Sequence, residues 1–208
     1  MSNISITNEC NMQLMARYPD NYFDLAIVDP PFGININSSG RLGKYGGKNK
    51  KWDLSIPDDD YFKELFRVSK NQIIWGGNYF NLPPTRCFLI WDKKQPEGIS
   101  FASCEMAWTS FNLSAKTFYK RPHDSEIIRI HVTQKPVKLY EWLLLNYAKE
   151  NDKILDTHGG SMSIALAVHN VNAKEKMNLT LDICELDTDY YNAAIKRIEQ
   201  HKAQLTLF

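Results

Sequence analysis

Short apolar runs alternate with stretches of helical periodicity along most of the chain. Runs rich in β-branched and aromatic residues predict strands at 3–7, 24–29, 71–75, 87–92, 104–111, 153–156 and 180–185. Apolar residues spaced three and four apart predict helices at 9–17, 59–69, 136–149, 161–169 and 188–202. Because strands separated by helices of this length usually pair in parallel, the pattern predicts an α/β fold with a mostly parallel sheet and helices on both faces.

One long segment breaks this alternation. Residues 33–58 are rich in Gly, Ser, Asn and Lys and show no apolar period. A loop of this length inside a compact domain is usually functional or disordered. With 208 residues, of which 43% are hydrophobic, the chain is long enough for one well-buried core. We therefore expect a single domain over 1–208 that carries a mobile basic loop at 33–58.

Charge and cysteine content exclude several classes of protein. The 25 Lys and Arg residues nearly balance the 24 Asp and Glu residues, so only local clusters are informative about nucleic acid. The four cysteines lie far apart without a Cys-x-x-Cys pair, which predicts neither a metal site nor a disulfide framework and fits a reducing cytoplasm. The first residues lack the pattern of a signal peptide, and no run approaches about 18 apolar residues, so we expect a cytoplasmic protein with no membrane span.

The predicted strand at 24–29 ends in an unusual way. Its apolar run stops at Asp29, which is followed by Pro30, Pro31 and Phe32. In an open α/β sheet, ligands bind beyond the carboxyl ends of the strands, where Asp29 is expected to lie. The prolines stiffen the peptide and carry no amide hydrogen, so its carbonyl groups are available as acceptors. The Asp29 carboxylate and the Pro30 carbonyl are thus suited to bind both N–H groups of a nucleobase amine, while Phe32 stacks on the base.

Such binding would activate the amine. An exocyclic amine is a poor nucleophile because its lone pair is delocalised into the ring. Two acceptors that hold both N–H groups favour a pyramidal nitrogen, and their gain appears chiefly in the transition state, where the nitrogen becomes cationic. This strand end therefore predicts attack of a base amine on an electrophilic methyl carbon.

A second strand end is typical of a nucleoside site. One strand ends at Asp156 and leads through Gly159 and Gly160 into a helix that begins near Ser161. Glu185 ends the next strand, where a carboxylate can take both ribose hydroxyls in a doubly wound fold. The alternative is a simple tight turn beside a solvated acid. A dinucleotide site is less favoured because Gly-x-Gly-x-x-Gly is absent.

Four segments resemble motifs of the amino-group DNA methyltransferases, which use S-adenosyl-L-methionine. The stretch from Asp29 to Phe32 resembles the family's Asp-Pro-Pro-[Tyr/Phe] motif, and residues 131–144 resemble its His-Pro-Thr-Gln-Lys-Pro segment. Residues 154–167 resemble its cofactor loop, and residues 183–198 resemble the strand and helix that follow. The order of the motifs resembles the beta class. The resemblance thus implies a circularly permuted, Rossmann-like methyltransferase fold that acts on DNA.

The resemblance also implies roles for individual residues. Asp29, Pro30, Pro31 and Phe32 would be catalytic, with a lean towards adenine N6 over cytosine N4 because Asp rather than Ser opens the motif. The strand at 3–7 would lie beside the strand that carries the ribose-binding acid. The implied cofactor-binding residues are Glu9, Cys10, Asp29, Lys135, Asp156, His158, Gly159, Gly160, Ser161, Met162, Glu185 and Leu186.

Several of these residues depart from the family's pattern. Thr157 and His158 replace Pro-Phe, and Met162 replaces a glycine that allows close backbone approach, so we expect a reshaped cofactor loop. His158 is interpreted as a ring that lines the cleft rather than a proton shuttle, because methyl transfer from a sulfonium needs no strong base. Lys135 either holds the methionine carboxylate or caps the loop before the helix at 136–149.

A DNA methylase must flip its target base and hold the strand while it does so. Two basic segments, in the loop at 33–58 and at 112–125, are candidates for phosphate contacts, and the alternative for each lysine is a solvated loop. The candidate nucleic-acid-binding residues are Arg41, Lys44, Tyr45, Lys48, Lys50, Lys51, Lys116, Lys120 and Arg121. Since the chain has no room for a large recognition domain, we expect a short recognition site or a homodimer.

The last five residues suggest a partner. The segment from Gln204 to Phe208 looks like the short peptide with which bacterial replication proteins bind the sliding clamp. An exposed tail of this kind would raise the effective concentration of a methylase at newly made DNA. The alternative is that the tail packs on its own sheet or on a dimer mate. Two other functions also stay open at this stage: a degenerate methylase that serves as a binding module, and an RNA or protein-glutamine methyltransferase.

Overall fold

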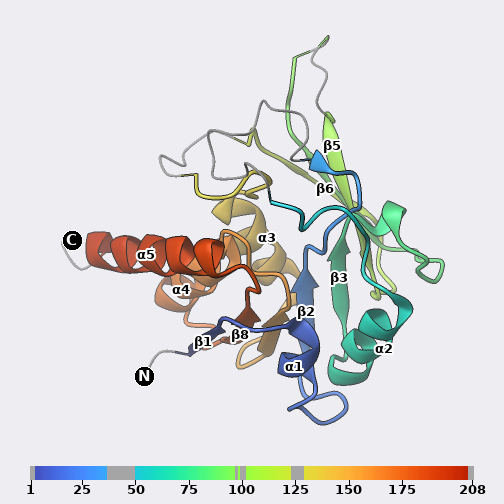
Figure 1. Ribbon diagram of the computed structural model, residues 1–208. Coiled ribbons are helices and arrows are strands. Elements are labelled where there is room, and N and C mark those ends of the chain that lie inside the picture. Colours follow the sequence, from blue (N-terminus) through green and yellow to red (C-terminus); the bar gives the residue numbers. More distant parts are fainter. Residues whose placement is uncertain (1–2, 37–49, 97, 99–101, 123–128, 206–208) are drawn as a thin grey trace.

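The computed structural model describes residues 3–36, 50–96, 98, 102–122 and 129–205 (Figure 1). Within them, one sheet contains strands β1 (Ile4–Thr7), β2 (Leu25–Val28), β3 (Gln72–Trp75), β4 (Phe88–Asp92), β5 (Cys104–Thr109), β6 (Lys116–Tyr119), β7 (Lys153–Asp156) and β8 (Thr180–Cys184). The α-helices are α1 (Asn11–Met15), α2 (Asp59–Val68), α3 (Val137–Tyr147), α4 (Ser163–Glu175) and α5 (Thr188–Leu205). A short 3₁₀ helix, η3, spans Gly77–Tyr79.

The sheet is mostly parallel, as the sequence predicts. Its strands lie in the order β1-β8-β7-β2-β3-β5-β4-β6. Among the described strands, only β5 runs antiparallel to its neighbours, which are β3 and β4. Strand β1 pairs in parallel with β8. The first strand therefore completes the sheet beside a strand from near the other end of the chain, which confirms the arrangement expected from the motif order.

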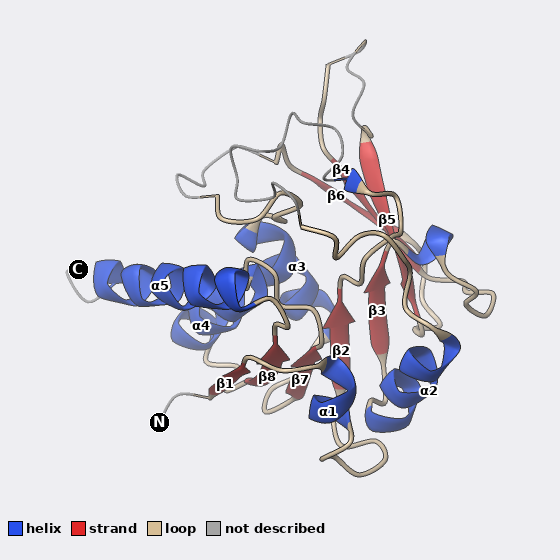
Figure 2. Cartoon of the chain, viewed as in Figure 1, coloured by secondary structure: helices blue, strands red, loops and turns tan. Residues whose placement is uncertain are grey.

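Helices cover both faces of the sheet (Figure 2). Leu25 and Ile27 of β2 belong to the apolar cluster that contains α3, α4 and α5. Ala26 and Val28 belong to the cluster on the other face, which contains α1 and α2. Because successive side chains of a strand point to opposite faces, a strand covered on both sides needs apolar residues at every position. This explains the unbroken apolar run before Asp29.

Helix α2 shows how local sequence signals place an element. The Asp58 side chain accepts the backbone N–H of Tyr61 at 2.9 Å, which satisfies a donor that the first turn of the helix leaves without a backbone partner. Tyr61, Leu65 and Val68 are buried on one side of the helix. Their spacing of three and four residues is the pattern that predicts this helix.

Strand β6 and the second half of α4 are not predicted by the apolar pattern. Most β6 side chains are exposed, because the strand lies at the edge of the sheet and pairs with β4. Few of its positions therefore need to be apolar. Helix α4 continues beyond the predicted range of 161–169 and ends at Glu175.

The connections that leave β2 and β7 turn to opposite faces of the sheet. Strand β2 leads towards α2 in one layer, and β7 leads to α4 in the other. Neighbouring parallel strands whose connections diverge in this way leave a crevice at their carboxyl ends. Asp29 follows β2 and Asp156 ends β7. The fold thus brings together two of the strand ends that the sequence singled out.

No helix in the described part of the chain is long and apolar enough to cross a membrane. Helix α5 ends at Leu205. Of the tail that resembles a clamp-binding peptide, residues 206–208 and the side chains of 204 and 205 lie outside what the structure describes.

Candidate active site

A cavity of about 240 Å³ lies at the carboxyl ends of the central strands. Every residue that the sequence predicts for the cofactor lines it, except Asp156 and Met162. The rings of Trp52, His131 and Tyr190 also line this cavity, although the sequence did not predict them as cofactor-binding residues. The His131 ring lies 5.2 Å from the Trp52 ring and 4.3 Å from the Tyr190 ring, measured between centroids. Burial lowers the pKa of His131 to about 3, so this part of the wall is uncharged near neutral pH.

The glycine turn and Glu185 form another wall of this cavity. The Gly159 N–H donates to the Cys184 carbonyl at 2.8 Å, and a Cβ on Gly159 would lie 3.1 Å from the same oxygen, so the turn packs closely against β8. The Glu185 carboxylate accepts the Gly160 N–H at 2.7 Å and the Asp187 N–H at 2.8 Å. Burial raises the pKa of Glu185. A carboxylate fixed in this way retains lone pairs for two hydroxyl groups of a ligand.

The two predicted residues that do not line the cavity support the loop from behind. Met162 has a φ of 53°, in the left-handed region that favours glycine. Its side chain is fully buried in the core and does not crowd the cavity. Asp156 accepts the His158 N–H at 3.0 Å, and burial raises the pKa of Asp156 to about 8. Both residues therefore shape the loop instead of facing a ligand.

A chain of hydrogen bonds holds the His158 ring. Its Nε2 lies 3.2 Å from Asn11 Nδ2, and its Nδ1 lies 3.0 Å from Thr157 Oγ1. The Tyr61 hydroxyl lies 2.7 Å from the same Thr157 oxygen. Since the Asn11 amide nitrogen can only donate, Nε2 accepts and Nδ1 carries the proton. Burial lowers the pKa of His158 to about 4. A neutral ring with both nitrogens bound supports its interpretation as part of the wall.

A second cavity of about 320 Å³ adjoins the first. The residues that line both cavities are Asp29, Pro31, Trp52, Thr133 and Lys135. Pro30 and Phe32 line only the second cavity. Asp29 therefore stands at the junction, where a molecule held in one cavity can meet a molecule held in the other.

The loop after β2 is held by an acid that the sequence did not single out. The buried Asp53 carboxylate accepts the N–H groups of Phe32 at 2.8 Å, Gly33 at 2.9 Å and Ile36 at 2.9 Å. These bonds fix the conformation of the peptide that leaves Asp29. No local pattern distinguishes Asp53 from the other acids of the segment at 53–60.

Phe32 has a stacking partner within the chain. Its ring lies 4.9 Å from the Tyr79 ring, and the two planes differ by 9°. Gly76 has a φ of 71°, and a Cβ there would lie 2.1 Å from the Phe32 ring, so the ring needs glycine beneath it. The sequence predicts that Phe32 stacks on a base. The structure adds Tyr79, which is 43% exposed and lines the same cavity.

Two acids and two lysines meet at the junction of the cavities. The buried Lys135 ammonium contacts Asp29 Oδ2 and lies 3.1 Å from Glu105 Oε2. Lys93 lies 2.8 Å from Glu105 Oε1. Burial raises the pKa of Asp29, with a further contribution from Glu105, while the lysines act in the opposite direction. No described residue forms a hydrogen bond to Asp29 Oδ1. This oxygen is buried, and its capacity to accept a hydrogen bond is unused in this structure.

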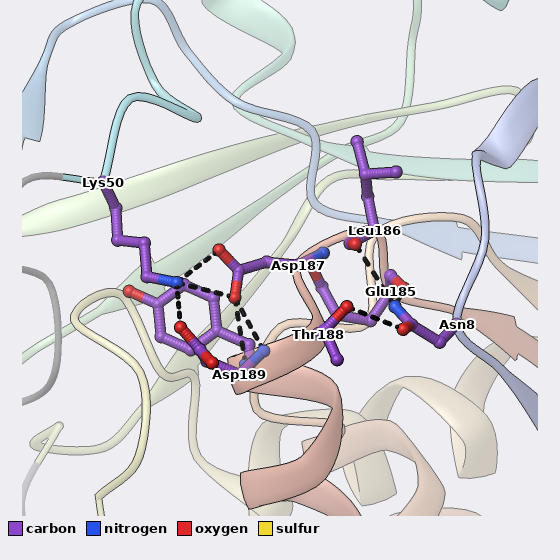
Figure 3. A network of polar contacts seen from close by, with 8 residues as sticks. Asn8, Lys50, Glu185, Leu186, Asp187, Thr188 and Asp189 are labelled. Atoms are coloured by element: carbon purple, nitrogen blue, oxygen red, sulfur yellow. Dashed lines mark hydrogen bonds and ion pairs between the residues drawn. The ribbon is translucent and has the colours of Figure 1, made fainter.

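Lys50, predicted to contact nucleic acid, is bound to the loop that follows Glu185 (Figure 3). Its ammonium lies 2.6 Å from both Asp187 Oδ2 and Asp189 Oδ2. These hydrogen bonds raise the pKa of Lys50. Asn8 holds the same loop by donating to the Glu185 carbonyl at 2.7 Å. Lys50 thus connects the segment before Trp52 to a wall of the first cavity.

The other predicted nucleic-acid-binding residues fall into four groups. Arg41, Lys44, Tyr45 and Lys48 lie outside the described residues, and Lys51 is exposed. Lys116 begins β6 and donates to Asn146 Oδ1 at 2.9 Å. Lys120 and Arg121 follow the carboxyl end of β6, which runs parallel to β4. Strands β4 and β2 run in the same direction. Lys120 and Arg121 therefore lie at the same end of the sheet as Asp29, where the parallel strands have their carboxyl ends.

A comparison with known sequence families shows the family to which this chain belongs. A family described as DNA methylase, with members acting on N6 or N4 amines, matches residues 78–203, which is more than half of the chain. The chain therefore belongs to the N6/N4 DNA methylase family. The match begins after the segment that contains Asp29. The position of Asp29 between the two cavities is therefore an observation separate from the match.

Solved structures share the fold. The M1.HpyAVI–SAM complex has a TM-score of 0.58 and 17% sequence identity, and the match covers 94% of this chain and 99% of that chain. The PvuII DNA methyltransferase, described as cytosine-N4-specific, has a TM-score of 0.64 and 14% identity over 94% of this chain and 86% of that chain. At these identities the likeness establishes the fold. A comparison with curated proteins finds no match.

Proposed function

We propose that this protein transfers a methyl group from S-adenosyl-L-methionine to the exocyclic amine of a base in DNA, and that the base is adenine. One observation carries the proposal. Asp29 lines both cavities where they meet, and its buried Oδ1 has no hydrogen-bond partner among the described residues, so this oxygen can accept an N–H once a base is bound beside it. Membership of the DNA methylase family supports the same reaction.

The residues of the first cavity fit this cofactor. Glu185 offers a fixed carboxylate for the two ribose hydroxyls. Leu186 lines the cavity and is 72% exposed, so it can cover the face of a purine ring. Gly159 and Gly160 bring backbone rather than side chains to the wall. When bound, S-adenosyl-L-methionine supplies an electrophilic methyl group; the likeness in fold to the M1.HpyAVI–SAM complex supports this choice.

The second cavity positions the amine. Asp29 Oδ1 accepts one N–H of the amine, and the Pro30 carbonyl accepts the other, so the nitrogen becomes pyramidal and its lone pair turns towards the first cavity. A bound sulfonium donor would give up its methyl carbon as the carbon–sulfur bond broke and the nitrogen–carbon bond formed, and the nitrogen held by Asp29 and Pro30 would become cationic. The hydrogen bond to the charged carboxylate then strengthens, and bonds of this kind contribute about 1.5–3 kcal/mol. The extra proton leaves the product nitrogen to water.

The base must leave the duplex before Asp29 can reach its amine. The rings of Phe32 and Tyr79 give the second cavity an aromatic wall on which a flipped base can stack, which contributes about 1–3 kcal/mol per base. Lys120 and Arg121 follow β6 at the end of the sheet where Asp29 lies and are candidates for phosphate contacts.

Identification of the methylated nucleoside tests this proposal. The protein is incubated with unmethylated DNA of broad sequence content and isotopically labelled S-adenosyl-L-methionine, and the DNA is digested to nucleosides for mass spectrometry. We expect labelled N6-methyldeoxyadenosine. Labelled N4-methyldeoxycytidine would instead support the second candidate, cytosine N4, which the likeness in fold to the PvuII enzyme favours. Label in neither nucleoside would refute the proposal.

A further inference from the structure

The mechanism above does not use Glu105, although this acid lies at its centre. Glu105 stands near the start of β5, Lys93 follows β4, and Lys135 precedes α3. Because β5 runs antiparallel, its beginning lies at the edge of the sheet where the parallel strands end. Three separate elements thus bring Glu105, Lys93 and Lys135 next to Asp29, and all four residues line the second cavity.

Lys135 alone would be a poor neighbour for a catalytic carboxylate. Its ammonium contacts Asp29 Oδ2, and its side chain is only 2% exposed, so water screens their attraction weakly. An ammonium that pairs solely with Asp29 neutralises the charge that must stabilise a cationic amine nitrogen. It also draws the carboxylate away from the target amine. The same ammonium is needed, however, because a buried carboxyl group without a cation tends to take up a proton.

Glu105 offers Lys135 a second partner. The Lys135 Nζ lies 3.1 Å from Glu105 Oε2, and Lys93 holds the other oxygen, Oε1, at 2.8 Å. The two acids therefore share one buried ammonium, while Lys93 orients Glu105 from the side away from Lys135. In this arrangement Asp29 Oδ1 has no hydrogen-bond partner among the described residues.

We propose that Glu105 is a positioning residue, which shares the Lys135 ammonium with Asp29 and so keeps Asp29 Oδ1 available to the target amine. The inference rests on the proposed function. The charged groups that act on Asp29 are Lys135, Glu105, Lys93 and, from β7, Asp156. Glu105 adds a negative charge beside Asp29, so its removal should lower the pKa of Asp29. Lys135 adds a positive charge, so its removal should raise that pKa.

The pH dependence of a single turnover of methyl transfer tests the proposal. Transfer needs the Asp29 carboxylate, so the rate rises as pH passes through the pKa of Asp29. In Glu105→Gln we expect this acid limb to move to lower pH, because a neighbouring negative charge is lost. The plateau rate should fall by roughly tenfold or more, the scale of one hydrogen bond to a charged group, because Lys135 now pairs with Asp29 alone. In Lys135→Gln the acid limb should move to higher pH.

Matched variants separate positioning from a loss of folding. Glu105→Asp keeps the charge, so it should restore the position of the acid limb and part of the plateau rate. Glu64→Gln makes the same chemical change on the surface of α2, where Glu64 pairs with Arg67, and should alter neither quantity. Thermal unfolding of each variant shows whether it is folded at the assay temperature.

A second measurement does not depend on activity. Carboxyl ¹³C NMR follows the titration of Asp29, whose signal is assigned by its disappearance in Asp29→Asn. We expect a lower midpoint in Glu105→Gln and a higher one in Lys135→Gln. An unchanged or raised midpoint in Glu105→Gln would overturn the role of Glu105. Failure of the wild-type protein to methylate DNA would instead contradict the proposed function, and the titration would still decide whether Glu105 acts on Asp29.

Discussion

Met162 adopts a backbone conformation for which glycine is the usual residue. Its φ of 53° lies in the left-handed region, and its side chain is fully buried against the core. The sequence predicted a reshaped cofactor loop, because Met162 replaces a glycine that allows close backbone approach. In this structure the side chain is buried behind the turn, and the left-handed conformation of Met162 immediately precedes α4.

Two opposing effects decide what Met162→Gly does to stability. Loss of a large buried apolar side chain costs about 2–5 kcal/mol, and relief of the left-handed backbone returns about 1–2 kcal/mol. We therefore expect the free energy of unfolding to fall by a net amount of up to about 4 kcal/mol. Urea unfolding measures this change, with Met162→Leu as a control that keeps most of the volume. A Met162→Gly variant more stable than the wild type would contradict the packing described here.

The site residues differ in how far the sequence reveals them. Asp29 and Glu185 could be predicted because each ends a recognisable apolar strand, and parallel strands bring their carboxyl ends to one edge. Asp53, Lys93 and Glu105 could not, because long-range packing alone brings them to the junction. Glu105 in particular depends on the antiparallel direction of β5, which the apolar pattern does not encode.

At the scale of elements, residues 50–53 connect the two cavities. Lys50 binds the acids at the start of α5, Trp52 lines both cavities, and Asp53 holds the loop that follows Asp29. The segment thus lies between the part of the chain that carries Glu185, the proposed ribose-binding acid, and the part that carries the proposed catalytic residues after β2. Breaking the ion pairs of Lys50 should loosen the wall of the first cavity.

Lys50→Met tests the function of this segment. We expect cofactor binding to weaken by about threefold to tenfold and cofactor release to become faster, because partly exposed ion pairs contribute up to about 1 kcal/mol each. Calorimetry and stopped-flow release, both without DNA, measure the two effects. Lys51→Met removes a neighbouring exposed lysine and should change neither. Equal behaviour of the two variants would show that the Lys50 contacts do not hold the cavity wall.

At the scale of the whole molecule, the sheet places two adjoining cavities at the carboxyl ends of its parallel strands. Strands β7 and β8 carry the loops of the first cavity, and β2 places Asp29 between that cavity and the second. The sequence predicted this convergence because its alternation of strands and helices defines a parallel sheet. It did not predict the edge strand β6, whose exposed residues carry no apolar signal.

The proposed role of the Asp29 carboxylate in methyl transfer is tested by Asp29→Asn. This substitution is preferable to Asp29→Ala, since Asn removes the charge but keeps the size of the side chain and an amide oxygen that can accept a hydrogen bond from Lys135. We expect single-turnover methyl transfer to DNA to fall by about 100-fold or more, while the dissociation constant for S-adenosyl-L-methionine changes by less than about threefold. Transfer at the wild-type rate in a folded Asp29→Asn protein, with the cofactor bound, would contradict this role.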